Sequence, residues 1–117
     1  MKDSQTFRTF AIRTFRTMET ITVQELKAKL DAGEDIQVID VREEHEVIEY
    51  NFGAQHIPMG DILGRTEDVR RDCPVVVHCR SGKRSAAVIS ALEQKHGYTN
   101  LINLDGGVLA WYEVFEG

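Results

Sequence analysis

A cysteine begins a short loop between two apolar segments. The residues from Val75 to His78 predict a buried strand, and the segment beginning at Ser85 predicts a helix. Between them the chain reads Cys79-Arg-Ser-Gly-Lys-Arg84. A loop in this position can direct backbone N–H groups and the positive end of the helix dipole at the cysteine sulfur. We therefore expect Cys79 to react as a thiolate that carries an anionic group.

The loop also holds three cations, Arg80, Lys83 and Arg84, and a glycine, Gly82, which permits a tight turn. An ordinary cysteine has a pKa of about 8.5, whereas helix N-termini and cations lower it to roughly 3.5–7.5. Alternatively, the basic residues are only solvated and Cys79 is a small buried apolar side chain. We favour the thiolate, because three cations at a helix N-terminus oppose the helix dipole and require a compensating anion.

Two serines in the loop have two interpretations. Ser81 and Ser85 can donate hydroxyl hydrogen bonds to bound sulfur or substrate oxygen, but serine is also a common helix cap. We expect the backbone amides from Arg80 to Ser85 to be the main donors. No general base and no cofactor is expected, because a thiolate attacks sulfur directly. His78 is then interpreted as a packing residue at the strand end.

The loop resembles the active-site loop of the rhodanese family of sulfurtransferases. The similarity extends to Ile39-Asp-Val-Arg-Glu43, His56-Ile-Pro58 and Leu104-Asp-Gly-Gly-Val-Leu-Ala-Trp111, which follow the family's order. The resemblance implies that a sulfane sulfur passes from a small anionic donor such as thiosulfate to Cys79. The persulfide then transfers it to cyanide or a thiol. The segment from Gly53 to Gly60 departs from the family's usual glycine pattern, which affects the expected rim of the site.

Other functions remain as alternatives. One is a relay or binding module that delivers the persulfide to a protein partner. A cysteine-dependent phosphatase or arsenate reductase is less favoured, because phosphatases need an arginine after five intervening residues to grip a phosphoryl group. Ser85 occupies that position, and Arg84 comes one residue earlier.

Strands alternating with helices predict an α/β, rhodanese-like three-layer fold with a mainly parallel central sheet flanked by helices. Strands are expected over 36–40, 74–78 and 101–104, and helices over 22–30, 43–50, 85–95 and 108–115. Asp40, Cys79 and Asp105 then share the edge where ligands bind in such folds. Asp40 caps the next helix in one interpretation, and Arg42 either forms a structural salt bridge or orients the donor.

Composition sets further limits. The chain has 117 residues and a net charge of −5, which argues against a nucleic-acid partner. No segment has the ~20 apolar residues of a membrane helix or a signal peptide, so we expect no membrane association and a cytoplasmic location. A strand between Cys73 and Cys79 spans roughly 20 Å, which excludes a disulfide between them. No metal site is expected, because metal-ligand spacings are absent.

The chain divides into two parts. Residues 19–117 are expected to form the rhodanese-like domain. Residues 1–18 are expected to be an N-terminal extension that is disordered or loosely attached. Four basic residues, Lys2, Arg8, Arg13 and Arg16, are balanced there only by Asp3, and aromatic residues lie between them, a composition that weakly resembles an amphipathic transit segment.

Overall fold

A computed structural model of the chain describes residues 18–117. The strands are β1 (Thr20–Ile21), β2 (Gln37–Asp40), β3 (Gln55–His56), β4 (Val75–His78) and β5 (Leu101–Leu104). The helices are α2 (Val23–Asp31), α3 (Glu44–Glu49), α4 (Met59–Ile62), the 3₁₀ helix η1 (Thr66–Asp68), α5 (Lys83–His96) and α6 (Gly107–Phe115). The predicted extension lies outside the described residues, apart from Met18, which packs against the core.

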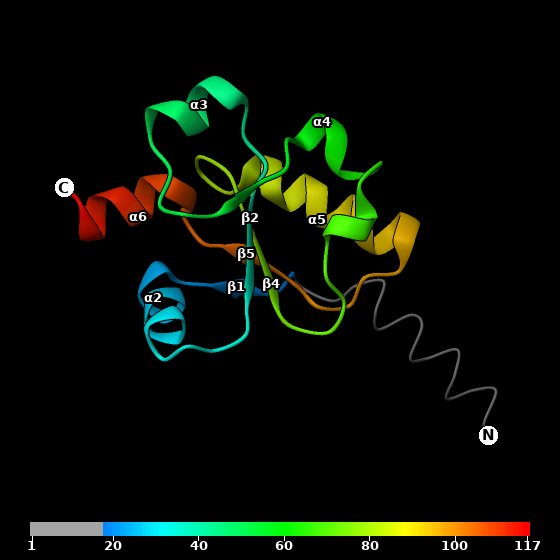
Figure 1. Cartoon of the computed structure of the whole chain (residues 1–117), viewed down its shortest axis with the longest axis horizontal. Helices are drawn as coiled ribbons and strands as arrows, with labels where there is room; N and C mark the ends of the chain where they lie inside the picture. Colours follow the sequence, from blue (N-terminus) through cyan, green and yellow to red (C-terminus); the bar gives the residue numbers. More distant parts are fainter. Residues whose placement is uncertain (1–17) are drawn as a thin grey trace.

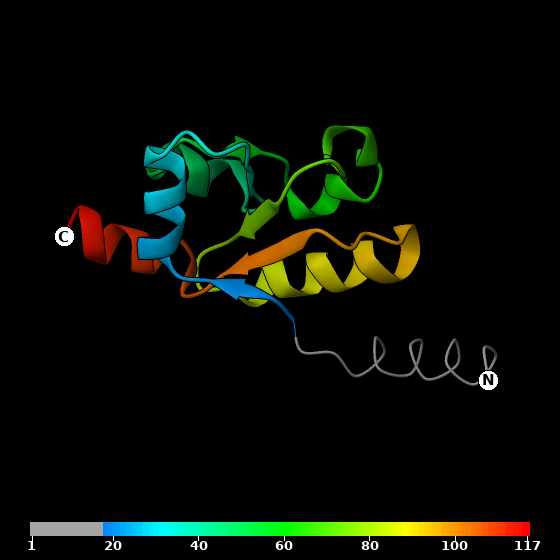
Figure 2. The ribbon, with the colours of Figure 1, turned by 90° about the horizontal axis from the view of Figure 1, so that it is seen from below.

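The strands form one sheet in the order β1-β5-β4-β2-β3, and all neighbours are parallel. In Figure 2 the arrows of β1, β5 and β4 point the same way. Because the strands are parallel, their carboxyl ends meet at one edge of the sheet, as expected for Asp40, Cys79 and Asp105. The α/β fold predicted from the sequence is confirmed.

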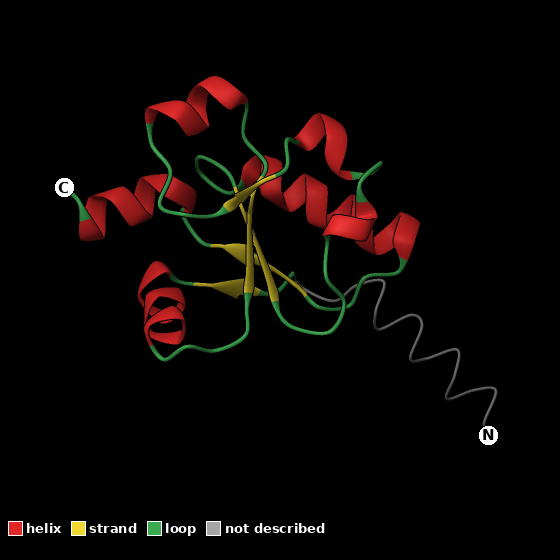
Figure 3. Ribbon diagram, in the orientation of Figure 1, coloured by secondary structure: helices red, strands yellow, loops and turns green. Residues whose placement is uncertain are grey.

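Helices cover both faces of the sheet, with α2 and α6 on one side and α4 and α5 on the other (Figures 1 and 3). The alternation of side chains along β4 supplies both cores. Val75 and Val77 pack with residues of α4 and α5, whereas Val76 packs with Leu26 of α2 and Trp111 of α6. Trp111 lies in this core beside Phe115, with ring centroids 4.7 Å apart.

Local sequence signals explain most element boundaries. A capping box starts α2 at Thr22, since the Thr22 hydroxyl accepts from the Glu25 N–H and the Glu25 carboxylate accepts from the Thr22 N–H. The atypical segment before α4 keeps the fold, because Ile57 remains fully buried. The cap predicted at Asp40 is wrong. The capping box of α3 is formed instead by Glu43 and Glu46.

Among the helices that the structure describes, none combines the length and apolar character needed to cross a bilayer. Cys73 and Cys79 are both free thiols and both are buried, so the two cysteines are independent, as predicted.

Candidate active site

The loop after β4 wraps around the Cys79 sulfur. The side chain of Cys79 is 1% exposed, and the backbone N–H of Gly82 donates a hydrogen bond to Sγ at 3.1 Å. Gly82 has a φ of +113°, in a region that side chains other than glycine rarely adopt, and it caps the N-terminus of α5. Cys79 is therefore both buried and hydrogen-bonded, which combines the two alternatives considered from the sequence.

Ser85 lies inside the first turn of α5 rather than at its cap, because the left-handed Gly82 starts the helix earlier than predicted. Its buried hydroxyl lies 3.4 Å from the Cys79 Sγ. Burial raises the pKa of Cys79, but hydrogen bonds from the Ser85 hydroxyl and from the N–H groups of Ser85, Gly82 and Ser81 lower it by more. The net pKa is lower than that of an ordinary cysteine.

The N-terminus of α6 orients the loop from the other side. The N–H of Val108 donates to the carbonyl of Cys79 at 2.9 Å, and the N–H of Leu109 donates to that of Arg80 at 3.1 Å. Because a trans peptide places its N–H opposite its carbonyl, these bonds turn the N–H of Ser81 towards the sulfur. A Cβ on Gly107 would lie 2.5 Å from both carbonyl oxygens, so this close approach requires glycine.

The three cations of the loop have different environments. Arg84 forms a two-pronged ion pair with Glu46, with Nη–Oε distances of 2.7 and 2.9 Å. Glu46 is partly exposed on the flank of α3, and its carboxylate holds Arg84. Arg80 and Lys83 are exposed and form no ion pair within residues 18–117.

Asp40 and Arg42 form a buried ion pair beside the loop. The guanidinium of Arg42 donates to both carboxylate oxygens, with the shortest contact 2.7 Å from Nη2 to Oδ2. Nη2 also donates to the carbonyl of Tyr50 at 2.7 Å, and the Arg42 backbone N–H donates to Asp40 Oδ1. The geometry matches the structural salt bridge considered from the sequence.

His78 ends β4 beneath this pair and is fully buried. Its ring stacks on Phe52, with centroids 4.8 Å apart, and Phe52 stacks on Trp111 at 4.0 Å. Burial lowers the pKa of His78, although Asp40 opposes this effect. His78 is therefore neutral at neutral pH and packs as predicted.

A groove of about 520 Å³ runs beside the loop between α3 and α6. Arg80 lies on its lining together with Glu49, Tyr50, Leu109 and Tyr112. Leu109 is 45% exposed and Tyr112 is 50% exposed, which is high for large apolar side chains. The groove therefore joins an exposed cation to an apolar surface next to the cysteine.

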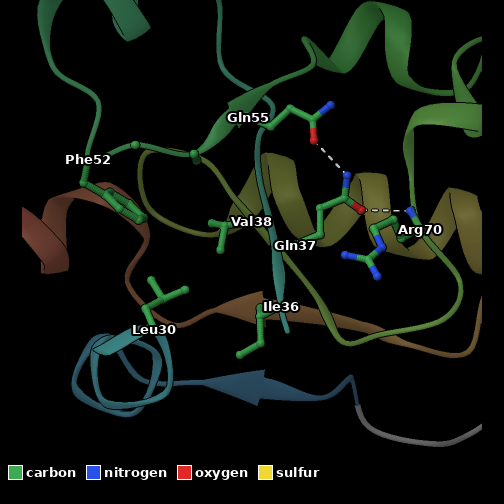
Figure 4. A pocket seen from close by; sticks show the side chains of 9 residues that line it. Leu30, Ile36, Gln37, Val38, Phe52, Gln55 and Arg70 are labelled. Atoms are coloured by element: carbon green, nitrogen blue, oxygen red, sulfur yellow. Dashed lines mark hydrogen bonds between the residues drawn. The ribbon is translucent and has the colours of Figure 1, made fainter. Parts of the chain in front are cut away.

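A second cavity, of about 420 Å³, has no lining residue from the cysteine loop. Figure 4 shows Leu30, Ile36, Val38 and Phe52 around the hollow, while Gln37 bonds to Gln55 and to Arg70. The polar groups of Gln37 are satisfied by these contacts.

The structure brings Cys79, Ser81, Gly82 and Ser85 together around the sulfur. It also adds residues that the sequence analysis missed. Asn103 of β5 is buried and donates from Nδ2 to the carbonyl of Gly82 at 3.1 Å. A polar residue inside the apolar segment Leu101–Leu104 was an available signal for it. Glu46 had no comparable signal as a site residue, since its partner is distant in sequence. Gly107 lies in the family motif from Leu104 to Trp111, but its contact with the Cys79 loop was not predicted.

Comparison with known proteins identifies the family of this chain. The family description "Rhodanese-like domain" matches residues 22–114. YtwF of Bacillus subtilis (strain 168), named for an inferred sulfurtransferase activity, is 40% identical over 95 residues, covering 80% of this chain and 90% of YtwF. A sulfurtransferase of Allochromatium vinosum is 35% identical over 92 residues, covering 78% of this chain and 85% of that protein.

Among solved structures, a rhodanese-like domain protein from Staphylococcus aureus superimposes with a TM-score of 0.73 at 35% identity. The match covers 80% of this chain and 91% of that one. The family match over residues 22–114 includes β4, α5 and most of α6, which position the cysteine loop. The chain therefore belongs to the rhodanese-like family of sulfurtransferases.

Proposed function

We propose that the protein transfers a sulfane sulfur from a thiosulfate-like donor through a persulfide on Cys79. The Cys79 thiolate attacks the outer sulfur of the donor and forms a new S–S bond. The S–S bond of the donor breaks, and sulfite leaves with the electron pair. The observation that carries this proposal is the cluster of hydrogen-bond donors around the sulfur, which lowers the pKa of Cys79.

The second half of the reaction returns the enzyme to its starting state. Cyanide or a thiolate attacks the outer sulfur of the persulfide, and the S–S bond to Cys79 breaks. The electron pair stays on the Cys79 sulfur, which the backbone N–H groups again stabilise. Arg80 and Lys83 are exposed at the loop, and in this proposal they attract the anionic donor. Arg84, held by Glu46, keeps the loop in place.

Intact-protein mass spectrometry after thiosulfate treatment tests the assignment. We expect the mass to rise by one sulfur atom, and we expect cyanide to reverse the change and release thiocyanate. Cys79→Ser should abolish the gain, whereas Cys73→Ser, which removes the other buried thiol, should retain it. Sulfur loading that persists in Cys79→Ser would refute the proposal.

A protein thiol as acceptor is the second candidate, favoured by the groove beside the loop. Exposed Leu109 and Tyr112 offer an apolar surface that a small acceptor such as cyanide does not need. Leu109→Ser and Tyr112→Ser should slow transfer to a protein acceptor and leave thiocyanate formation unchanged. If the two variants transferred sulfur to the protein acceptor as fast as the wild type does, a docking role for these two residues would be excluded.

A further inference from the structure

The Ser85 hydroxyl lies between two acceptors. Its Oγ is 2.6 Å from Oδ1 of Asn103 and 3.4 Å from the Cys79 Sγ. A hydroxyl carries one hydrogen, so it cannot donate fully to both atoms. The shorter distance places this hydrogen on Asn103 while the sulfur is uncharged. The donor to Cys79 is therefore shared with a competitor on the neighbouring strand.

The orientation of the Asn103 amide is fixed by its other contacts. Nδ2 donates to the carbonyl of Gly82 at 3.1 Å, which leaves Oδ1 directed at Ser85. The reversed amide would place Oδ1 against the Gly82 carbonyl, which is also an acceptor, so the pattern of partners selects one orientation. Asn103 is held in β5 between β1 and β4, opposite Thr20 and Val77. Its carbonyl-type oxygen is thus a rigid competitor for the Ser85 hydrogen.

We propose that Asn103 is a positioning residue that controls, through the single hydrogen of Ser85, how strongly the Cys79 sulfur is stabilised as an anion. In the thiolate, the negative charge attracts the hydrogen away from Asn103. In the persulfide, the charge lies on the outer sulfur, and the inner sulfur is a weak acceptor, so the hydrogen returns to Asn103. The hydroxyl then follows the charge during sulfur transfer.

This inference rests on Cys79 as the nucleophile of the proposed function, and it is independent of the donor and acceptor. Other charged and titratable groups lie on the loop and on the elements packed against it. They are Arg80 and Lys83 of the loop, Arg84 of α5, His78 of β4, the Asp40–Arg42 pair after β2, Glu46 of α3, and Asp105 after β5. All of them are unchanged in the variants below, so their effect cancels in the comparison.

The test is a double-mutant cycle in a Cys73→Ser background, which leaves Cys79 as the only thiol. The rate of iodoacetamide alkylation is measured against pH, and its midpoint reports the ionisation of Cys79. Asn103→Leu should lower the midpoint by about one pH unit, because the Ser85 hydrogen is released to the sulfur. With Ser85→Ala already present, the same substitution should not lower it.

The cycle separates positioning from a general loosening of the loop. Asn103→Leu also removes the bond to Gly82, and any effect of that loss appears equally with and without Ser85. An identical shift of the midpoint in both backgrounds would overturn the proposal. Asn100→Leu is the matched control, since Asn100 bonds to the carbonyls of Arg70 and Cys73. It should change thermal stability and leave the midpoint in place.

The cycle does not depend on sulfur transfer. If Cys79 alkylates with the expected coupling but never gains sulfur from thiosulfate, the proposed function fails and the role of Asn103 stands. If thiosulfate loads sulfur on Cys79 but the coupling between Asn103 and Ser85 is absent, the proposed function stands and the role of Asn103 fails.

Discussion

The Cys79 loop and the Asp40–Arg42 pair lie at the same edge of the sheet, yet they stabilise negative charge differently. The carboxylate of Asp40 has a counter-ion, whereas the sulfur of Cys79 has hydrogen-bond donors. Arg42 pairs with Asp40 through three side-chain contacts, and both residues are buried. The Cys79 sulfur receives hydrogen bonds but has no directly bonded cation among residues 18–117. A permanent counter-ion would hold the sulfur in one charge state, whereas dipolar donors allow its charge to leave and return.

Glu46 links the two regions. Its backbone carbonyl accepts from Nη1 of Arg42 at 3.4 Å, while its carboxylate holds Arg84 at the start of α5. The short helix α3 thus contacts both the Asp40–Arg42 ion pair and the helix that follows the Cys79 loop. The comparison shows that neighbouring polar groups at a ligand-binding edge can divide structural and chemical roles.

The largest expected effect is on stability and comes from breaking the Asp40–Arg42 ion pair. Arg42→Met leaves the Asp40 carboxylate buried without its counter-ion, so the free energy of unfolding in urea should fall by about 3–5 kcal/mol. The double variant Asp40→Leu with Arg42→Met should recover much of this loss. Arg65→Met, which breaks an exposed pair with Asp68, is the control and should cost under about 1 kcal/mol. A shifted alkylation midpoint of Cys79 in folded Arg42→Met would contradict the division of roles.

Gly107→Ala should instead displace the Cys79 loop. The added methyl group would meet the carbonyl oxygens of Cys79 and Arg80 at 2.5 Å, so the loop must move away from α6. We expect the rate of sulfur transfer to fall by about 100-fold, because the backbone N–H groups of the loop no longer point at the Cys79 sulfur. Gly60→Ala, where a Cβ meets nothing within 4 Å, should retain activity. Full activity in Gly107→Ala would show that the α6 contacts do not orient the loop.

The smallest expected effect concerns the link between the regions. Arg84 lowers the pKa of Glu46 from 4.5 to about 2. A carboxyl whose pKa is lowered on folding stabilises the protein fully above pH 4.5, and this contribution disappears as the pH falls towards 2. Glu46→Gln should therefore cost about 1 kcal/mol at pH 7 and flatten the loss of stability in acid. Asp31→Asn, which breaks an exposed pair with Lys27, should leave the acid limb nearly unchanged. If the free energy of unfolding fell equally with decreasing pH in the wild type and in Glu46→Gln, this contribution would be ruled out.

Features that depend on local pattern could be predicted from the sequence. The strand over residues 101–104 and the capping box at Thr22 follow from neighbouring residues, and both are present. The two-residue strand β1 was missed, because Thr20 and Ile21 are too few to show an alternating pattern. Cys79 at the start of the loop was visible because strand, glycine turn and helix are contiguous.

Contacts between distant residues could not be predicted in the same way. The sequence indicated that three cations surround Cys79, but 38 residues separate Glu46 from Arg84, and no local pattern announces their pairing. The competition for the Ser85 hydroxyl likewise depends on the parallel register that brings Asn103 beside α5. The sequence therefore identifies the reacting atom, whereas the tertiary structure determines which groups control its charge.

The aromatic stack behind the loop gives the protein an internal optical probe. Trp111 is the sole tryptophan of the chain, and through Phe52 it is in ring contact with His78, the residue that precedes Cys79. A rearrangement of the loop on loading or unloading should therefore alter the indole emission. Turnover can then be followed by stopped-flow fluorescence on the unlabelled protein.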